Sequence, residues 1–562
     1  MMRARRVSVL AAAIAAALTA VPAGAEPDAG AYLAARAALR SGDFSGAAAY
    51  LLTAIVADPD NPALVNSALA AYVGTGQIGA AAPLAERALA EGWRSQLANM
   101  VHVAVLAENG DWAGVLADLD AGRSVSQLTD GLTRGWALIG AGDMQAGLAA
   151  FDAVADTRGM RPFGLYLKAL ALASAGDFEG ADAIFSLAPE QGMIRSRRSV
   201  LAHAQVLSQL GRNPDAVALI DATFPAGADP TLDLLRARLA AGETLPWTVV
   251  SNARDGLAET YYTVAGAIVD ETEDSNVLFH GRIALALRPD FTEARLLVAQ
   301  ILDRLGQFDL SRAAFAEIPP DDPTFAIAEL GRAEELRKLG DLSAGTEVLA
   351  RLARDQPDFA PAQVRLADFL RLGERTDEAI AAYDRAITLT PEDDPALWRL
   401  FYARGTLSFR QDNWPAAEAD FTRALELSPD QASVLNFYGY SLLERGEKLD
   451  QALDMIQRAT DADPQNGAIV DSLGWAFYRL GRLPEAVETL ERAVALEPGD
   501  ATINDHLGDA YWSVGRAREA RFQWSRALSF DPAEADAERI RAKLDHGPEE
   551  AAQPLDVAGS GG

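Results

Sequence analysis

Small and apolar residues recur along the chain between two sets of helix-breaking residues, each with a period close to 34 residues. Gly42, Gly76 and Gly110 stand 34 residues apart, and glycine ends a helix readily because it can adopt the left-handed conformation. A ladder of prolines follows at nearly the same period: Pro289, Pro323, Pro357, Pro391, Pro429, Pro464, Pro498 and Pro532. Proline stops a helix because it lacks an N–H and clashes with the preceding turn. The pattern predicts pairs of short helices, each turned by a glycine and many ended by a proline.

The spacing of small, apolar and aromatic residues inside one unit narrows the fold. The clearest unit reads Leu507, Gly508, Tyr511, Gly515, Ala520, Trp524, Ala527 and Pro532. These residues and their spacings resemble the tetratricopeptide repeat family. The resemblance implies an all-α chain, a right-handed α-solenoid of about 15 helical hairpins in which each pair contacts mainly its neighbours. That number includes four weaker turns, at Gly242, the acidic loop 270–276, Gly373 and Asp412.

Breaks in the rhythm suggest how the chain is divided. We predict a signal peptide at 1–25, an N-terminal array at 26–221, an irregular joint at 222–254 and a C-terminal array at 255–535. The remainder, 536–562, is expected to be the end of a terminal helix and a disordered tail, because it is rich in Gly, Pro and Glu.

The N-terminus has the three parts of a secretory signal. A basic start with Arg3, Arg5 and Arg6 precedes an apolar run and small residues that end at Ala25. We expect cleavage after Ala25 and a periplasmic location. The alternative is an uncleaved anchor in the inner membrane, although the apolar run is short for a membrane span.

Composition removes several classes of function. The 562 residues contain 50 Lys and Arg against 80 Asp and Glu, a formal net charge of -30, which argues against nucleic acid as a partner. There is no Cys, so thiolate metal sites and a lipid anchor through cysteine are not expected. The five His show no metal-ligand spacing. No phosphate-binding or nucleophile motif remains outside the repeats, so we expect no catalytic residues, no metal and no cofactor.

The family resemblance also implies a binding groove. In these repeats the first helix of each pair lines the concave face, and Gly439, Gly474 and Gly508 fix the register. The implied groove residues are Asn436, Tyr440, Asp471, Trp475, Tyr478, Asp505, His506, Asp509 and Trp512. Aromatic rings beside polar groups suit an extended peptide or a protein surface. The alternatives are that the rings pack between helices and that Asp471 and Asp505 bond neighbouring helices.

The carboxylates make this groove acidic, so a basic or amide-rich partner is favoured over a free carboxyl terminus. The amino-acid sequence of residues 430–532 is similar to that of proteobacterial envelope tetratricopeptide proteins. Some of these proteins act as adaptors for periplasmic carboxyl-terminal processing proteases. We therefore expect a non-catalytic scaffold that binds other envelope proteins or peptides, a periplasmic protease among them. The alternative is a carbohydrate-associated factor in polysaccharide or peptidoglycan assembly, since stacked aromatic rings also bind sugars. The sequence leaves the oligomeric state open.

Overall fold

A computed structural model describes residues 29–41, 43–193, 195–224 and 229–547. These residues form 30 α-helices and one short 3-10 helix, and no strand occurs among them, so the predicted all-α fold is confirmed. The predicted signal peptide, its cleavage site after Ala25 and the tail 548–562 lie outside the described residues. The chain divides into two compact units between Leu352 and Ala353, about 100 residues after the segment 222–254 where the sequence suggested a joint.

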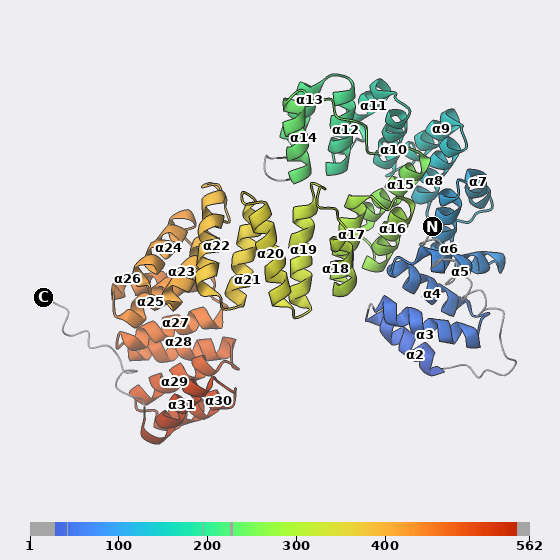
Figure 1. Cartoon of the computed structure of the whole chain (residues 1–562). Coiled ribbons are helices and arrows are strands. Elements are labelled where there is room, and N and C mark those ends of the chain that lie inside the picture. Colours follow the sequence, from blue (N-terminus) through green and yellow to red (C-terminus); the bar gives the residue numbers. More distant parts are fainter. Residues whose placement is uncertain (1–28, 42, 194, 225–228, 548–562) are drawn as a thin grey trace. The chain divides into compact units, whose positions relative to one another are not determined.

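The first unit contains the helices coloured blue to olive in Figure 1. They are α2 (Ala29–Arg40), α3 (Phe44–Ala57), α4 (Pro62–Gly74), α5 (Ile78–Ala90), α6 (Gln96–Glu108), α7 (Trp112–Asp120), α8 (Gln127–Gly140), α9 (Met144–Ala155), α10 (Arg161–Ser174), α11 (Phe178–Phe185), η1 (Pro189–Gln191), α12 (Arg197–Gln209), α13 (Asn213–Thr223), α14 (Pro230–Ala240), α15 (Ala253–Ile268), α16 (Asp274–Leu287), α17 (Thr292–Arg304), α18 (Phe308–Ala316), α19 (Phe325–Lys338) and most of α20 (Leu342–Asp355).

The second unit continues from the end of α20 to the C-terminus. Its helices are α21 (Ala360–Leu372), α22 (Thr376–Leu389), α23 (Leu397–Arg410), α24 (Trp414–Leu427), α25 (Ala432–Arg445), α26 (Leu449–Ala462), α27 (Gly467–Arg479), α28 (Leu483–Leu496), α29 (Ala501–Ser513), α30 (Ala517–Leu528) and α31 (Glu534–His546).

Gly-Asp pairs form the turns within several hairpins, as the spacing predicts. Gly110 has a φ of +74°, a conformation that only glycine adopts without strain. The Asp111 side chain after it accepts a hydrogen bond from the backbone N–H of Gly114 at 2.9 Å. This contact caps the first turn of α7, whose N–H groups have no partner within the helix. Asp43, Asp143, Asp177 and Asp341 cap their helices in the same way.

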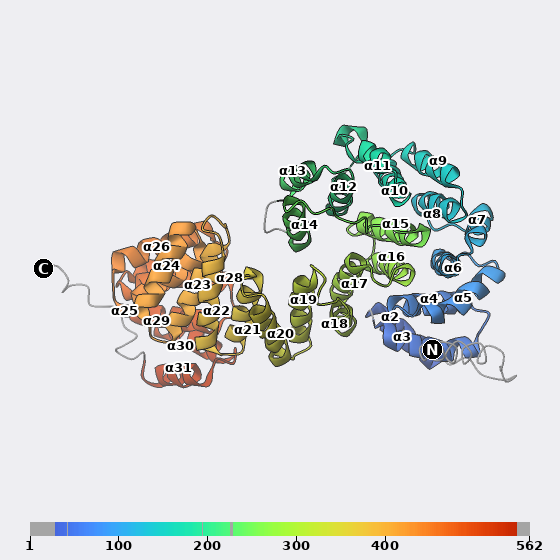
Figure 2. The ribbon, with the colours of Figure 1, turned by 45° about the horizontal axis from the view of Figure 1, so that its top comes forward.

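In the first unit two later helices, α15 and α16, pack against the inside of the array formed by the earlier helices. Figures 1 and 2 both show α15 and α16 inside the arch formed by α4 to α14. Helix α15 contacts α8 and α10, while α16 contacts α4 and α6. The approach is close, because a Cβ atom at Gly256 would lie 2.3 Å from the ring of Trp136. The helices α15 and α16 therefore fill the face of the array that a partner would otherwise enter.

The segment before α15 departs from the predicted repeat. Gly242 does end α14, with a φ of +81°, but no helix pairs with α14 directly after it, because α15 begins only at Ala253. The intervening chain is fastened to α12. The backbone N–H of Leu245 donates to Ser208 at 2.9 Å, and that of Thr248 donates to Gln205 at 2.9 Å. The other three weak turns do connect paired helices, α15 to α16, α21 to α22 and α23 to α24.

Candidate functional site: the inner face of the C-terminal repeats

The first helices of the last repeats lie against one another in the second unit. Helix α27 contacts both α25 and α29, and glycine lets each first helix approach its partner closely. A Cβ atom at Gly474 would lie 2.6 Å from Leu490, and one at Gly508 would lie 2.4 Å from Trp524. Only a small residue therefore fits at Gly474. We call the surface formed by α23, α25, α27, α29 and α31 the inner face.

The acidic end of the inner face is neutralised by α31. The Lys543 ammonium lies 2.8 and 2.9 Å from the two carboxylate oxygens of Asp505 and 2.7 Å from Asp509. Arg539, one turn earlier on α31, donates to Asp505 at 2.6 Å. Lys543 is only 1% exposed and both aspartates are fully buried. Burial raises the pKa of Asp509 to about 6, against the lowering effect of Lys543.

A stacked column of rings lies beside this cluster. Trp475 stacks on His506 with ring centres 4.1 Å apart and on Tyr478 at 4.8 Å. His506 Nδ1 lies 2.9 Å from a carboxylate oxygen of Asp471. Burial alone would lower the pKa of His506, but the carboxylates of Asp471, Asp505 and Asp509 outweigh it and raise that pKa. The imidazolium form is therefore stabilised inside the protein.

Hydrogen bonds also link α25 to α27. The Trp475 Nε1–H donates to Glu444 at 2.9 Å, and the Arg479 guanidinium donates to the same oxygen at 3.2 Å. The Ser513 hydroxyl of α29 donates to the backbone carbonyl of Asp509 at 3.0 Å and lies 3.2 Å from the Tyr478 hydroxyl. The polar groups of the inner face thus connect each first helix to the next.

The implied groove residues are less exposed in the structure than the sequence predicts. Six of the nine implied groove residues are buried, namely Asp471, Trp475, Tyr478, Asp505, His506 and Asp509. The reason is that α31 closes over α29 and that the rings stack on one another. The expectation of an acidic groove is also corrected, because Lys543, Arg539 and His506 supply the opposite charges. The alternative in which Asp471 and Asp505 bond neighbouring helices matches the observed contacts.

The three remaining implied residues, Asn436, Tyr440 and Trp512, are partly exposed. Trp512 lies near the end of α31, because a Cβ atom at Gly547 would lie 2.8 Å from its ring. Asn436 and Tyr440 lie on α25. The Asn436 Oδ1 atom is buried without a hydrogen-bond partner among the described residues. Burial, with Glu444 and Asp471 nearby, raises the pKa of Tyr440 well above its usual range.

An open strip of the inner face therefore lies on α23 and α25. It consists of residues that are exposed or half-buried, and we name it the α23–α25 strip: Arg399, Tyr402, Thr406, Arg410, Ser433, Asn436, Phe437, Tyr440 and Glu444. The rings of Tyr402 and Phe437 meet edge to face, with centres 6.1 Å apart. Two of its members, Asn436 and Tyr440, are among the nine groove residues that the family resemblance implies. The residues on α23 were missed because the register was taken from Gly439, Gly474 and Gly508 alone, although Gly405 precedes Gly439 by 34 residues.

The first unit holds its inserted helix with a buried ion pair. Glu259 of α15 is fully buried. It accepts from the Tyr166 hydroxyl at 2.8 Å and from two nitrogens of Arg198 at 2.9 and 3.0 Å. Arg198 also donates to Glu293 at 2.7 Å. Because breaking such a pair leaves an uncompensated charge, this network fixes α15 inside the array.

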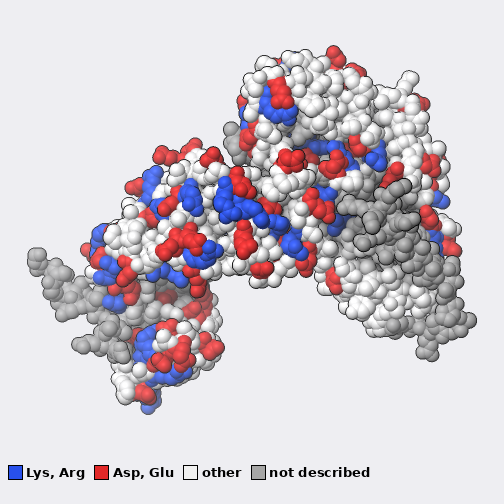
Figure 3. Space-filling model, viewed as in Figure 1, with Lys and Arg blue, Asp and Glu red and all other residues white. Residues whose placement is uncertain are grey.

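On the face shown in Figure 3, the second unit carries both Lys and Arg and Asp and Glu. Among the described residues, no group of three or more His, Asp or Glu could hold a metal ion. None of the described helices has the length and apolar character to cross a membrane.

Two curated proteins are similar to parts of the chain. A TPR repeat-containing protein, PA4667, of Pseudomonas aeruginosa is 31% identical over 117 residues, which cover 21% of this chain and 19% of that protein. Bacteriophage adsorption protein A of Escherichia coli K12 is 29% identical over 100 residues, covering 18% of this chain and 10% of that protein. The matched segments thus span a fifth or less of these relatives.

Solved structures with similar folds are more distant. A chain of the APC/C hetero-tetramer Cut9–Hcn1 is 16% identical, with a TM-score of 0.37 and coverage of 92% of this chain and 96% of that one. YrrB, described as a TPR protein with an unusual peptide-binding site, is 19% identical, with a TM-score of 0.28 and coverage of 35% and 98%.

The tetratricopeptide repeat family model matches six segments: 32–96, 132–193, 330–394, 402–467, 443–501 and 472–535. Together these segments cover more than half of the chain, and they fall on the helical hairpins described above. The chain therefore belongs to the tetratricopeptide repeat family.

Proposed function

We propose that this protein is a non-catalytic scaffold that binds an extended segment of a partner protein on the α23–α25 strip. Tetratricopeptide repeats are protein-interaction modules, and this chain consists largely of them. The observation that carries the proposal is the contrast between two inner faces. In the first unit α15 and α16 occupy the array, whereas the strip on α23 and α25 keeps aromatic, amide and charged side chains exposed or half-buried.

The chemistry of the strip suits a peptide. Tyr402, Phe437 and Tyr440 offer apolar area with few rotatable bonds, and such rings dominate binding energies at interfaces. The Asn436 amide nitrogen carries two N–H donors, so it can donate to a carbonyl of an extended backbone. Arg399 and Arg410 are exposed on α23. These arginines favour a partner segment that carries carboxylates.

We further propose that the protein works in the periplasm after cleavage at Ala25 and that its partners are envelope proteins, a processing protease among them. The signal-like N-terminus supports this location. Sequencing the N-terminus of protein from a periplasmic fraction should give Glu26 as the first residue. A mature chain that keeps residues 1–25 in the membrane fraction would instead support the uncleaved anchor.

Site-specific photocrosslinking in cells tests the partner site. A photoreactive residue in place of Tyr440 should enrich a small, reproducible set of envelope proteins. The matched control is the same residue in place of Arg492, which is exposed on α28, the second helix of its hairpin. Equal labelling of many proteins at both positions would contradict the proposal, and labelling of glycan at position 440 would favour the carbohydrate-associated function.

Point variants provide the energetic test. Asn436→Ala together with Tyr440→Ala should weaken binding of the captured partner by at least about tenfold, since residues at the centre of an interface commonly contribute more than 1 kcal/mol each. Arg492→Ala serves as the control. Circular dichroism should show unchanged helix content for all three chains. Unchanged affinity in the double variant would place the binding site elsewhere.

A further inference from the structure

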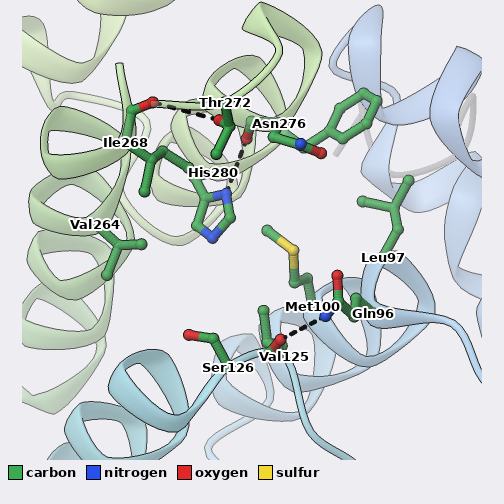
Figure 4. Close-up of a pocket in the computed structure, with 11 residues that line it drawn as sticks. Gln96, Leu97, Met100, Val125, Ser126, Val264, Ile268, Thr272, Asn276 and His280 are labelled. Atoms are coloured by element: carbon green, nitrogen blue, oxygen red, sulfur yellow. Dashed lines mark hydrogen bonds between the residues drawn. The ribbon is translucent and has the colours of Figure 1, made fainter. Parts of the chain in front are cut away.

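We propose that a pocket between α6 and the α15–α16 pair binds a small, uncharged, mainly apolar molecule that carries one hydrogen-bond donor. This pocket lies in the first unit and is independent of the α23–α25 strip. Its volume is about 280 Å³. It remains where α15 and α16 pass α6 without filling all the space (Figure 4).

The walls of the pocket are mainly apolar. Leu97 and Met100 come from α6, Val264 and Ile268 from α15, and Phe279 from α16. An apolar cavity of about 150 Å³ is enough to bind benzene in an engineered protein. This larger pocket therefore accommodates one substituted ring or an aliphatic molecule of similar size.

Most polar groups at the pocket are already bonded to the protein. The Gln96 amide donates to the carbonyl of Val125 at 2.9 Å. Ser126 is bonded to Thr129 at 2.8 Å, and the Thr272 hydroxyl donates to the carbonyl of Ile268 at 3.3 Å. No Asp, Glu, Lys or Arg lines the pocket. A charged ligand would lose its hydration here without gaining an opposite charge, so the pocket selects an uncharged one.

His280 supplies the directional contact. Its Nδ1 atom lies 2.8 Å from the backbone carbonyl of Asn276, and a carbonyl can only accept, so Nδ1 carries the proton. In neutral imidazole the other nitrogen, Nε2, is then a hydrogen-bond acceptor. Burial lowers the pKa of His280, which favours the neutral form. The side chain is 9% exposed, and Figure 4 shows its second nitrogen pointing into the open space of the pocket.

Nε2 has no hydrogen-bond partner among the described residues, so a hydroxyl or N–H group of a ligand can donate a hydrogen bond to it. The acceptor sits at one side of an apolar space and therefore orients the ligand as well as binding it. A phenol fits these requirements: a ring against Met100 and Val264, and a hydroxyl toward His280.

Fluorine NMR on the full-length protein tests this site with two probes, 4-fluorophenol and fluorobenzene. The wild-type chain should bind 4-fluorophenol about 3- to 10-fold more tightly, the range expected for one net hydrogen bond. His280→Phe keeps a ring but removes the acceptor, so both probes should bind with similar affinity. An unchanged preference for 4-fluorophenol in His280→Phe would overturn the assigned hydrogen bond.

A second set of variants tests the location. Met100→Trp should fill the pocket and abolish binding of both probes, and Leu97→Trp repeats the test if Met100→Trp fails to fold. The control is Met144→Trp on α9, a half-buried methionine that does not line the pocket. The proposal is overturned if the wild-type chain binds neither probe, or if the pocket-filling variants bind them as the control does. A Tyr-containing peptide that competes with 4-fluorophenol would identify a partner side chain as the occupant, and absence of competition would favour a free molecule.

Discussion

Lys543 offers a direct test of the closure of the C-terminal repeats by α31. We consider Lys543→Met, which keeps an unbranched side chain and removes the charge. In the wild-type chain Lys543 is 1% exposed and bonds to Asp505 and Asp509 at 2.7 to 2.9 Å. After the substitution, Asp505 keeps Arg539 at 2.6 Å, but Asp509 keeps only the Trp524 N–H at 3.0 Å. A buried carboxylate is thus left without a cation in direct contact.

The expected cost follows from this change. Removing one partner of a buried ion pair typically destabilises a protein by about 3–5 kcal/mol, because the remaining charge is desolvated and uncompensated. A loss of that size raises the equilibrium population of the open state at least about a hundredfold, since each 1.4 kcal/mol is a factor of ten. Helix α31 ends the described chain and packs mainly on α30 and α29, so this loss should detach it locally without unfolding the earlier repeats.

Hydrogen exchange of the full-length chain, followed by mass spectrometry, measures this opening directly. In Lys543→Met the amides of α31 should exchange like those of an unfolded segment, and those of α29 should exchange faster than in the wild-type chain. Amides of α2 to α14 should be unchanged. Arg539→Met is the matched control, because its side chain is 42% exposed and a solvated ion pair contributes less.

A rescue variant distinguishes charge from packing. Adding Asp509→Asn to Lys543→Met removes one charge of each sign and leaves Asp505 paired with Arg539. The cluster is then neutral again, and a neutral cluster of similar volume is often as stable as the original ion pairs. Protection of α31 should return at least in part. If Lys543→Met leaves exchange in α29 and α31 unchanged, the buried ion pairs do not hold α31 in solution and the reasoning fails.

Three further predictions concern other parts of the two units. The wild-type chain should lose stability relative to Asp509→Asn as pH rises from about 4 to about 6, by about 3 kcal/mol in all, measured by urea unfolding at each pH. The sign follows because the folded pKa of Asp509 is raised from 3.8 to about 6, so the folded state holds a proton that the unfolded state releases in that window. Glu259→Gln should cost about 1.5–3 kcal/mol, seen as faster exchange of α15, because it replaces charge-assisted hydrogen bonds to Arg198 and leaves that guanidinium only the Glu293 carboxylate at 2.7 Å. Gly474→Leu should lower the thermal unfolding midpoint more than Arg492→Ala does, because even a Cβ atom at Gly474 lies 2.6 Å from Leu490.

Local features of the fold were predictable from the sequence because they depend on neighbours in the chain. Glycine turns, aspartate caps and small residues at the helix contacts act within one hairpin, so their spacing alone defines the repeat. Gly110 and Asp111 illustrate this, since one gives the left-handed turn and the other caps α7. The weak signals at Gly373 and Asp412 were also correctly placed between paired helices.

The insertion of α15 and α16 could not be predicted in this way. The repeat pattern predicts that a hairpin packs on its sequence neighbours, whereas α15 contacts α8 and α10, far earlier in the chain. Glu259 meets Tyr166 across 93 residues, and no period of the sequence connects the two. No local sequence feature distinguishes a helix that continues an array from one that packs inside it. The one difference is that α15 is buried on nearly all sides.

The packing of α31 on α29, in contrast, can be predicted from the spacing of charged residues in the sequence. Residues one repeat apart on successive first helices are neighbours in a solenoid, as residues four apart are neighbours on one helix. Arg539 follows Asp505 by 34 residues, and Lys543 follows Asp509 by 34. His506 follows Asp471 by 35. Opposite charges separated by one period therefore identify the segment after Pro532 as a further first helix, and they indicate that the carboxylates of α29 are neutralised within the chain. On this reasoning, an acidic row in such an array counts as a binding surface for basic partners only when no cation stands one period away.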